Sequence, residues 1–133
     1  MRTMMRRLRM DRRGATAVEF ALLAPVFLLM FFGVFEVGRA MWIKSSMQFA
    51  VEEAARYAMV NTSATTTTVA TYAQTRFTDS GQSSTGVTFA ATQDTTGGVT
   101  FVSITATTTF TTLIDLVTFT NVTMTAKSRV PLL

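Results

Sequence analysis

At 133 residues the chain has room for one domain at most, and its formal net charge of +4 is unevenly distributed. Of twelve Lys and Arg, six precede residue 14 against one acid, so basic charge is not spread over a folded surface as nucleic-acid binding requires. Cysteine and histidine are absent and the carboxylates form no metal-binding or phosphate-binding motif, so we expect no enzyme, no metal and no cofactor.

The first predicted elements are a basic leader, residues 1–14, and an apolar run from Ala15 to Phe35. The run is about 21 residues long, which is enough for an α-helix to cross a bilayer core of about 30 Å. It exceeds the apolar core of an ordinary cleaved signal peptide. Because positive charge beside a membrane span stays cytoplasmic, we expect a single-pass protein of the inner membrane whose N-terminus is cytoplasmic and whose C-terminal part is extracytoplasmic.

Helical periodicity continues beyond the span, and we predict one transmembrane and projecting helix over residues 15–60. Where it leaves the membrane, Glu36 and Arg39 are expected to form an interfacial ion pair, and Trp42 is expected to anchor the helix at the lipid headgroups. An apolar stripe along the projecting half must pack on something, and its members are Val37, Met41, Met47, Val51, Ala54, Ala55 and Ala58.

Residues 61–133 are predicted to form a small Thr-rich extracytoplasmic β domain. Asn, Ser and Thr over 61–68 indicate a break in the helix, and a short helix follows over 69–77. The period then changes to two, which predicts strands over 86–93, 99–110 and 117–130. The fold class is therefore α+β, with a long helix, a short helix and an antiparallel sheet of about three strands.

Two details of the strands can be predicted. Gly97 and Gly98 suit a two-residue hairpin turn between the first two strands. The apolar alternation slips once near Phe101 and once near Asn121, for which a β-bulge is the simplest explanation. The threonines at 105, 107 and 109 are expected to face those at 123 and 125 across the strands.

Gly14 and the residues after it form the most informative motif. Basic residues precede Gly14, the small Ala15 follows, and Glu19 is the fifth residue after the glycine. This arrangement resembles the processing site of type IV-like prepilins, which a membrane-embedded peptidase cuts on the cytoplasmic side of the apolar segment. The resemblance implies cleavage between Gly14 and Ala15 and a prepilin peptidase as a partner.

The stretch "RRGATAVEFALLAPVFLLMFFGVFEVGRAMWIKSSMQFAVEEAARYA" resembles the N-terminal region of TadE-like proteins, pseudopilins of the tight-adherence (Flp) pilus system. The closing "TATTTFTTLIDLVTFTNVTMTAKSRVPLL" resembles the C-terminal hairpin of that family. Membership would imply a minor pilin-like component that supports fibre assembly and surface adhesion. Its partners would be other pilin subunits, the assembly machinery and membrane lipid, with no nucleic acid and no small-molecule substrate.

Glu19 stands inside an apolar segment, where a charge at the bilayer centre costs about 2.5–3.5 kcal/mol. By resemblance to type IV pilins it is an assembly residue, whose carboxylate receives the new α-amino group of Ala15 from a neighbouring subunit. The alternative is an acid tolerated at the membrane edge. Two other functions stay open: a membrane-tethered extracytoplasmic module that binds a ligand or partner, and a tethered enzyme that uses Asp79, Asp94 and Asp115.

Overall fold

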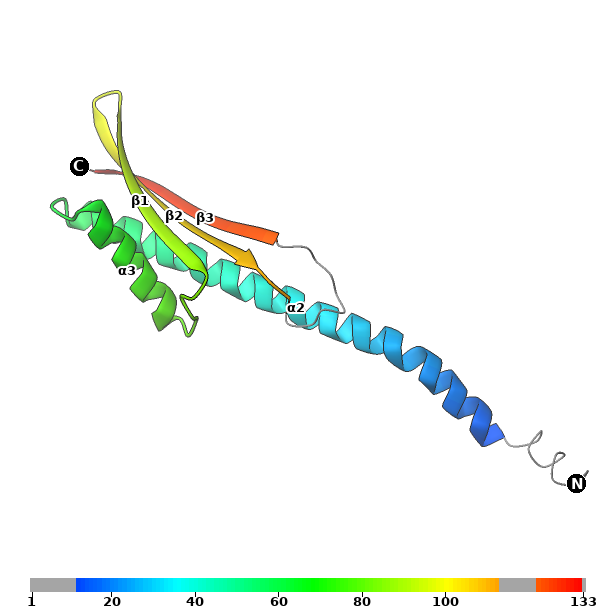
Figure 1. Cartoon of the computed structure of the whole chain (residues 1–133). Helices are drawn as coiled ribbons and strands as arrows, with labels where there is room; N and C mark the ends of the chain where they lie inside the picture. Colours follow the sequence, from blue (N-terminus) through cyan, green and yellow to red (C-terminus); the bar gives the residue numbers. More distant parts are fainter. Residues whose placement is uncertain (1–11, 113–121, 133) are drawn as a thin grey trace, which may run out of the picture. The chain divides into compact units, whose positions relative to one another are not determined.

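A computed structural model describes residues 12–112 and 122–132 of the chain, and its fold is α+β (Figure 1). The predicted fold class is confirmed. The chain divides into two compact units, Met1–Glu36 and Val37–Leu133. The elements in chain order are α2 (Arg12–Val60), α3 (Thr66–Asp79), β1 (Val87–Thr96), β2 (Val99–Phe110) and β3 (Val122–Leu132).

In the first unit, α2 presents apolar side chains that no other described residue covers. Leu22, Phe27 and Met30 are 71, 68 and 72% exposed. Within the described residues, α2 is the one helix that is long and apolar enough to cross a membrane. Pro25 lies inside it without ending it, as membrane helices allow. The helix supports single-pass anchoring of the chain.

In the second unit, the remainder of α2 forms one wall of the hydrophobic core. Alanines at three- and four-residue steps keep this wall flat and allow close approach of the sheet and of α3. The fully or almost fully buried core residues are Met47, Ala50, Val51, Ala54, Ala55 and Ala58 of α2, Val69, Ala73 and Phe77 of α3, Val102, Ile104 and Ala106 of β2, and Ala126 of β3.

The predicted stripe is confirmed from Met47 onward and is wrong for its first two members. Val37 and Met41 are 53 and 68% exposed. The six-residue step from Met41 to Met47 turns by about 240° around a helix with 3.6 residues per turn, so the two side chains cannot share a face. The core-facing side begins instead with the partly buried Ile43.

Helix α3 begins earlier than predicted because a threonine caps it. The Thr65 hydroxyl accepts a hydrogen bond from the backbone N–H of Thr68 at 3.2 Å, which satisfies one of the free donors of the first turn. The break between the helices therefore extends only from Asn61 to Thr65. The predicted short helix over 69–77 is confirmed inside the longer α3.

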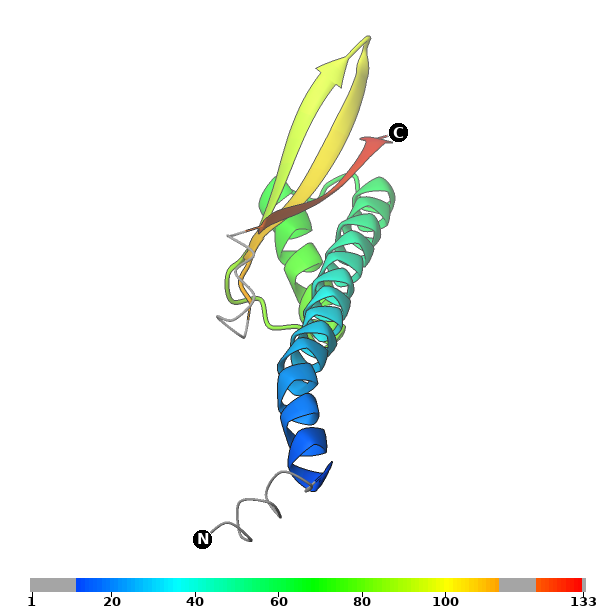
Figure 2. The same ribbon diagram turned by 90° about the vertical axis from the view of Figure 1, so that its right-hand side faces the viewer.

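The three strands form one antiparallel sheet in the order β1-β2-β3. Gly97 and Gly98 have φ angles of +62° and +81°, which glycine adopts without the penalty of a Cβ atom, and they form the predicted turn. The tip of this hairpin extends past the C-terminal end of α2 (Figures 1 and 2). The predicted third strand is described from Val122 onward.

The predicted bulge near Phe101 is wrong. The pairing of β1 with β2 is unbroken from Val87↔Thr108 to Thr96↔Val99, and β2 pairs with β3 without interruption from Thr100 onward. Phe101 simply points to the outer face, where the guanidinium carbon of Arg129 lies 4.2 Å from its ring centroid. The slip predicted near Asn121 lies outside the described residues.

Candidate functional site

Gly14 and Ala15, the predicted processing site, lie in the first turn of α2 that the structure describes, and both are exposed. A Cβ atom added at Gly14 would meet nothing within 4 Å, and Gly14 is not among the glycines with positive φ. Glycine inside a helix costs about 1 kcal/mol relative to alanine. Neither packing nor backbone conformation in this chain therefore requires a glycine at position 14.

Glu19 lies one helical turn after Ala15 and is exposed among apolar neighbours. Val18 and Phe20, which flank it, are 61 and 71% exposed. No hydrogen bond or ion pair of the Glu19 carboxylate occurs with any residue that the structure describes. The described part of the chain thus supplies this charge with no counter-charge.

Arg39 contacts the end of the sheet. Its guanidinium donates a hydrogen bond to the carbonyl oxygen of Thr111 at 2.5 Å and lies 4.2 Å from the ring centroid of Phe110. Trp42 is 59% exposed, as an interfacial anchor requires, and Glu36 is buried at 2% exposure. The ion pair between Glu36 and Arg39 stays a prediction, and Arg39 has the additional role of joining α2 to the end of β2.

Lys44 forms a second contact between α2 and the sheet, and this contact was not predicted from the sequence. Its Nζ donates to the carbonyl oxygen of Thr125 on β3. Beside this contact is an open groove of about 660 Å³, lined by Ala40, Met41, Lys44, Ser45 and Gln48 of α2 and by Thr123, Met124 and Thr125 of β3. The sequence contains one indication of this contact: Lys44 has no acidic residue one helical turn away with which to form an ion pair along α2.

The aspartates considered for catalysis do not form a common site. Asp79 at the end of α3 pairs with Arg76 at 3.3 Å, and Asp94 on β1 pairs with Arg129 at 2.5 Å. Asp115 lies outside the described residues. Within the described ranges, no group of three or more His, Cys, Asp and Glu side chains could hold a metal ion.

An aromatic pair joins the end of α2 to α3. The rings of Tyr57 and Tyr72 are stacked, with centroids 4.3 Å apart, beside an open cleft of about 370 Å³ otherwise lined by threonines. The guanidinium carbon of Arg76 lies 4.9 Å from the centroid of the Tyr72 ring, and the interaction with Tyr72, more than any nearby carboxylate, raises the pKa of Arg76 above its ordinary value. This guanidinium therefore stays charged at physiological pH and provides no pH switch.

The model of the family described as TadE-like protein matches residues 14–56. This segment is TadE-like. The match begins at Gly14 itself and covers the apolar half of α2 and most of its core-facing half, so the predicted resemblance of the N-terminal region is confirmed. The match does not extend to the closing stretch, whose resemblance stays a prediction. No curated protein and no solved structure matches the chain. The TadE-like segment supports, in general terms, a structural role associated with the Tad pilus and with other pilus components.

Proposed function

We propose that this chain is a minor, pilin-like component of a tight-adherence pilus assembly system. In this proposal a prepilin peptidase removes residues 1–14, and α2 from Ala15 onward remains as an anchor in the inner membrane. Residues 37–133 are extracytoplasmic, and the protein supports fibre assembly and adhesion. The observation that carries the proposal is the coincidence of the TadE-like match, which starts at residue 14, with a glycine that the fold does not need.

The unexplained glycine supports a role in recognition by another protein. Cleavage requires the first turn of α2 to unwind into the extended form that proteases bind, and a glycine lowers the cost of that unwinding. An additional side chain at position 14 would meet no atom of this chain, so any effect of such a substitution must come from outside the fold.

The exposed carboxylate of Glu19 supports the assembly part of the proposal. A lone charge among apolar side chains is costly once water is removed, whereas an opposite charge at hydrogen-bond distance offsets much of that cost. Processing would create the α-amino group of Ala15, which is largely protonated at neutral pH with an ordinary pKa of about 7.7–8.0. We infer that Glu19 of one subunit receives the amine of the next and sets their axial register.

Intact mass measurement tests processing and separates the pilin from a tethered binding module, which needs no cleavage. The chain is expressed in cells with an active prepilin peptidase, and the mature protein should begin at Ala15. Gly14→Leu should abolish cleavage while leaving membrane insertion intact. Gly33→Leu is the matched control, because a Cβ at that helical glycine also meets nothing within 4 Å, and it should be cleaved normally. A wild-type chain that keeps Met1 in such cells would exclude the processing step.

A further inference from the structure

The outer face of the sheet, opposite the helices, carries an array of hydroxyl groups. Inward positions on β2 alternate with outward ones, because Val102, Ile104 and Ala106 are buried in the core. The register then assigns the residues of β1 and β3 that lie directly opposite each outward residue. The outward and at least partly exposed hydroxyl residues, here called the hydroxyl face, are Thr88, Thr92, Thr105, Thr107, Thr109, Thr123 and Thr125. Ser103 has the same orientation but is only 8% exposed, so it is not part of this face.

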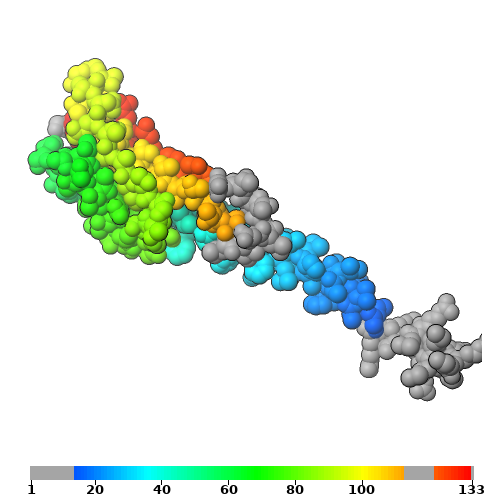
Figure 3. All heavy atoms as spheres, viewed as in Figure 1, coloured from blue at the N-terminus to red at the C-terminus, as the bar shows by residue number. Residues whose placement is uncertain are grey.

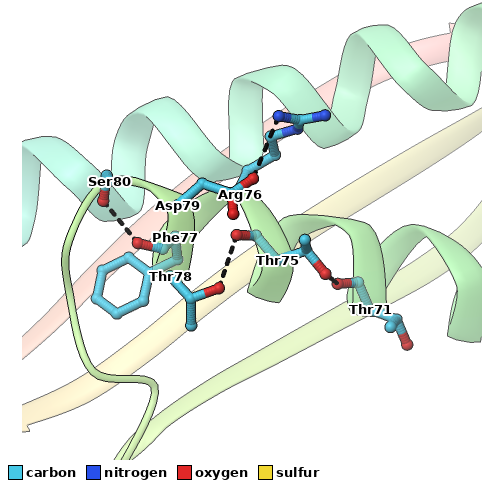
Figure 4. A network of polar contacts seen from close by, with 7 residues as sticks. All are labelled: Thr71, Thr75, Arg76, Phe77, Thr78, Asp79 and Ser80. Atoms are coloured by element: carbon cyan, nitrogen blue, oxygen red, sulfur yellow. Dashed lines mark hydrogen bonds and ion pairs between the residues drawn. The ribbon is translucent and has the colours of Figure 1, made fainter.

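The hydroxyls of this face have no hydrogen-bond partner among the residues that the structure describes. Not one of these side-chain oxygens makes a hydrogen bond to a residue within 12–112 or 122–132. The threonines of α3 behave differently, because their hydroxyls donate to carbonyl oxygens in the preceding turn. Thr71 donates to Thr67 at 3.0 Å, and Thr75 and Thr78 donate to Thr71 and Thr75 at 3.1 and 2.8 Å, the latter two bonds being visible in Figure 4. The hydroxyl face therefore keeps its full capacity to donate and accept.

The array is regular because it follows the sheet. Thr88, Thr107 and Thr125 lie in one row across all three strands. Neighbouring strands are about 4.8 Å apart, and outward side chains recur about every 6.7 Å along a strand. Threonine is stiff at χ1, so holding these hydroxyls in place for a ligand costs little conformational entropy. In the space-filling view the tip of the β1–β2 hairpin stands clear of α3 (Figure 3).

The charges on the same face are mainly positive. Lys127 is exposed opposite Thr105 and makes no ion pair with a described residue. Arg129 is the second cation, and Asp94, which pairs with it, is the one carboxylate among the described residues of the face. The aromatic ring of the face, Phe101, lies under the Arg129 guanidinium and is only partly exposed.

This composition favours one class of ligand. Protein–protein interfaces depend on large apolar or aromatic anchors at their centre, and the described residues of this face offer none that is uncovered. The regular hydroxyls favour a ligand that is itself rich in hydroxyls. The excess positive charge favours a ligand that carries negative charge. We propose that the hydroxyl face binds an extended acidic polysaccharide, with Lys127 contacting its carboxylates. The inference rests on the proposed function, since export brings this face into contact with extracellular polymers.

Cysteine protection tests the proposal locally, which matters because the six arginines of residues 1–14 would bind any polyanion. The chain contains no cysteine. Ala90→Cys places a thiol on the outer face opposite Thr105 without removing a hydroxyl, and Gln74→Cys places one on exposed α3. The full chain in lipid nanodiscs is treated with N-ethylmaleimide, a neutral reagent, in the presence of polygalacturonate or of dextran as the neutral polymer.

Polygalacturonate should slow modification of the Ala90→Cys variant at least about 3-fold and leave the Gln74→Cys variant unaffected, whereas dextran should protect neither. In the Ala90→Cys background, Thr107→Val and Lys127→Gln should each weaken the affinity for polygalacturonate about 2- to 12-fold, the range expected for one net hydrogen bond. Absence of protection, equal protection at both thiols, equal protection by dextran, or protection that survives both substitutions would overturn the proposal. None of these outcomes depends on whether residues 1–14 are removed, so failure here is distinguishable from failure of the proposed processing.

Discussion

Helix α2 carries methionines in both of its halves, and they have opposite environments. Met30 is 72% exposed, whereas Met47 is completely buried against α3 and the sheet. Up to Phe35 most apolar side chains of the helix are exposed within the described part of the chain, while from Ile43 onward the helix has one core-facing side. Composition alone therefore does not decide where an apolar side chain is buried.

The largest expected difference between the two halves is in folding stability. Met47→Ala removes a fully buried side chain and should lower the free energy of unfolding of the second unit by about 2–5 kcal/mol. Met30→Ala makes the same chemical change at an exposed position and should alter it by less than about 0.5 kcal/mol. Denaturant unfolding in detergent, followed by the fluorescence of the tyrosines and Trp42, measures both. Equal losses would show that the two halves are not energetically distinct.

The sequence predictions succeeded where the structure depends on neighbouring residues and failed where it depends on residues distant in the sequence. The span, α3 and the Gly97-Gly98 turn depend on periodicity and backbone preference within a few residues, and they were predicted correctly. Phe101 was misread as a bulge because its cover, Arg129, comes from a strand that is distant in the sequence. The Asp94–Arg129 ion pair and the contact of Lys44 with Thr125 were missed for the same reason, since they require the strand register.

The candidate site shows a different limit. Gly14 and Glu19 were selected from the sequence because their arrangement resembles a prepilin processing site, and in the structure both are exposed with no contact to a described residue that explains them. The roles proposed for them are interactions with other chains, which the fold of one chain does not test. By contrast, Arg39 was predicted from the sequence as a membrane-interface residue, and the structure adds its contacts with Thr111 and Phe110, which depend on the tertiary fold.

Removing the charge of Glu19 should have a small effect on the stability of the isolated chain and a large effect on its association with other subunits. Glu19→Gln keeps the shape and loses the charge, so the free energy of unfolding should change by less than about 0.5 kcal/mol and cleavage after Gly14 should continue. Association with other pilin subunits should fall, because the α-amino group of Ala15 loses its counter-charge. Glu52→Gln, in the second half of α2, is the control and should leave association unchanged. Co-purification with pilin subunits and counts of pili per cell measure the effect.

A Glu19→Gln chain that is processed and supports normal piliation would show that Glu19 is only an acid tolerated at the membrane edge. The opposite failure, loss of cleavage in this variant, would assign Glu19 to recognition by the peptidase instead of to assembly. The two measurements together therefore separate the roles that the sequence motif leaves combined.

Cysteine accessibility in intact spheroplasts tests most directly the claim that the two halves of α2 occupy lipid and extracytoplasmic space. Single cysteines are introduced at Phe27, at Ser45 and at Thr85, all of which are exposed in the structure. A membrane-impermeant thiol reagent should label the Ser45→Cys and Thr85→Cys variants from outside, and it should label the Phe27→Cys variant only after detergent is added. Labelling of Ser45→Cys and Thr85→Cys only after lysis, or labelling of Phe27→Cys in intact spheroplasts, would contradict the account.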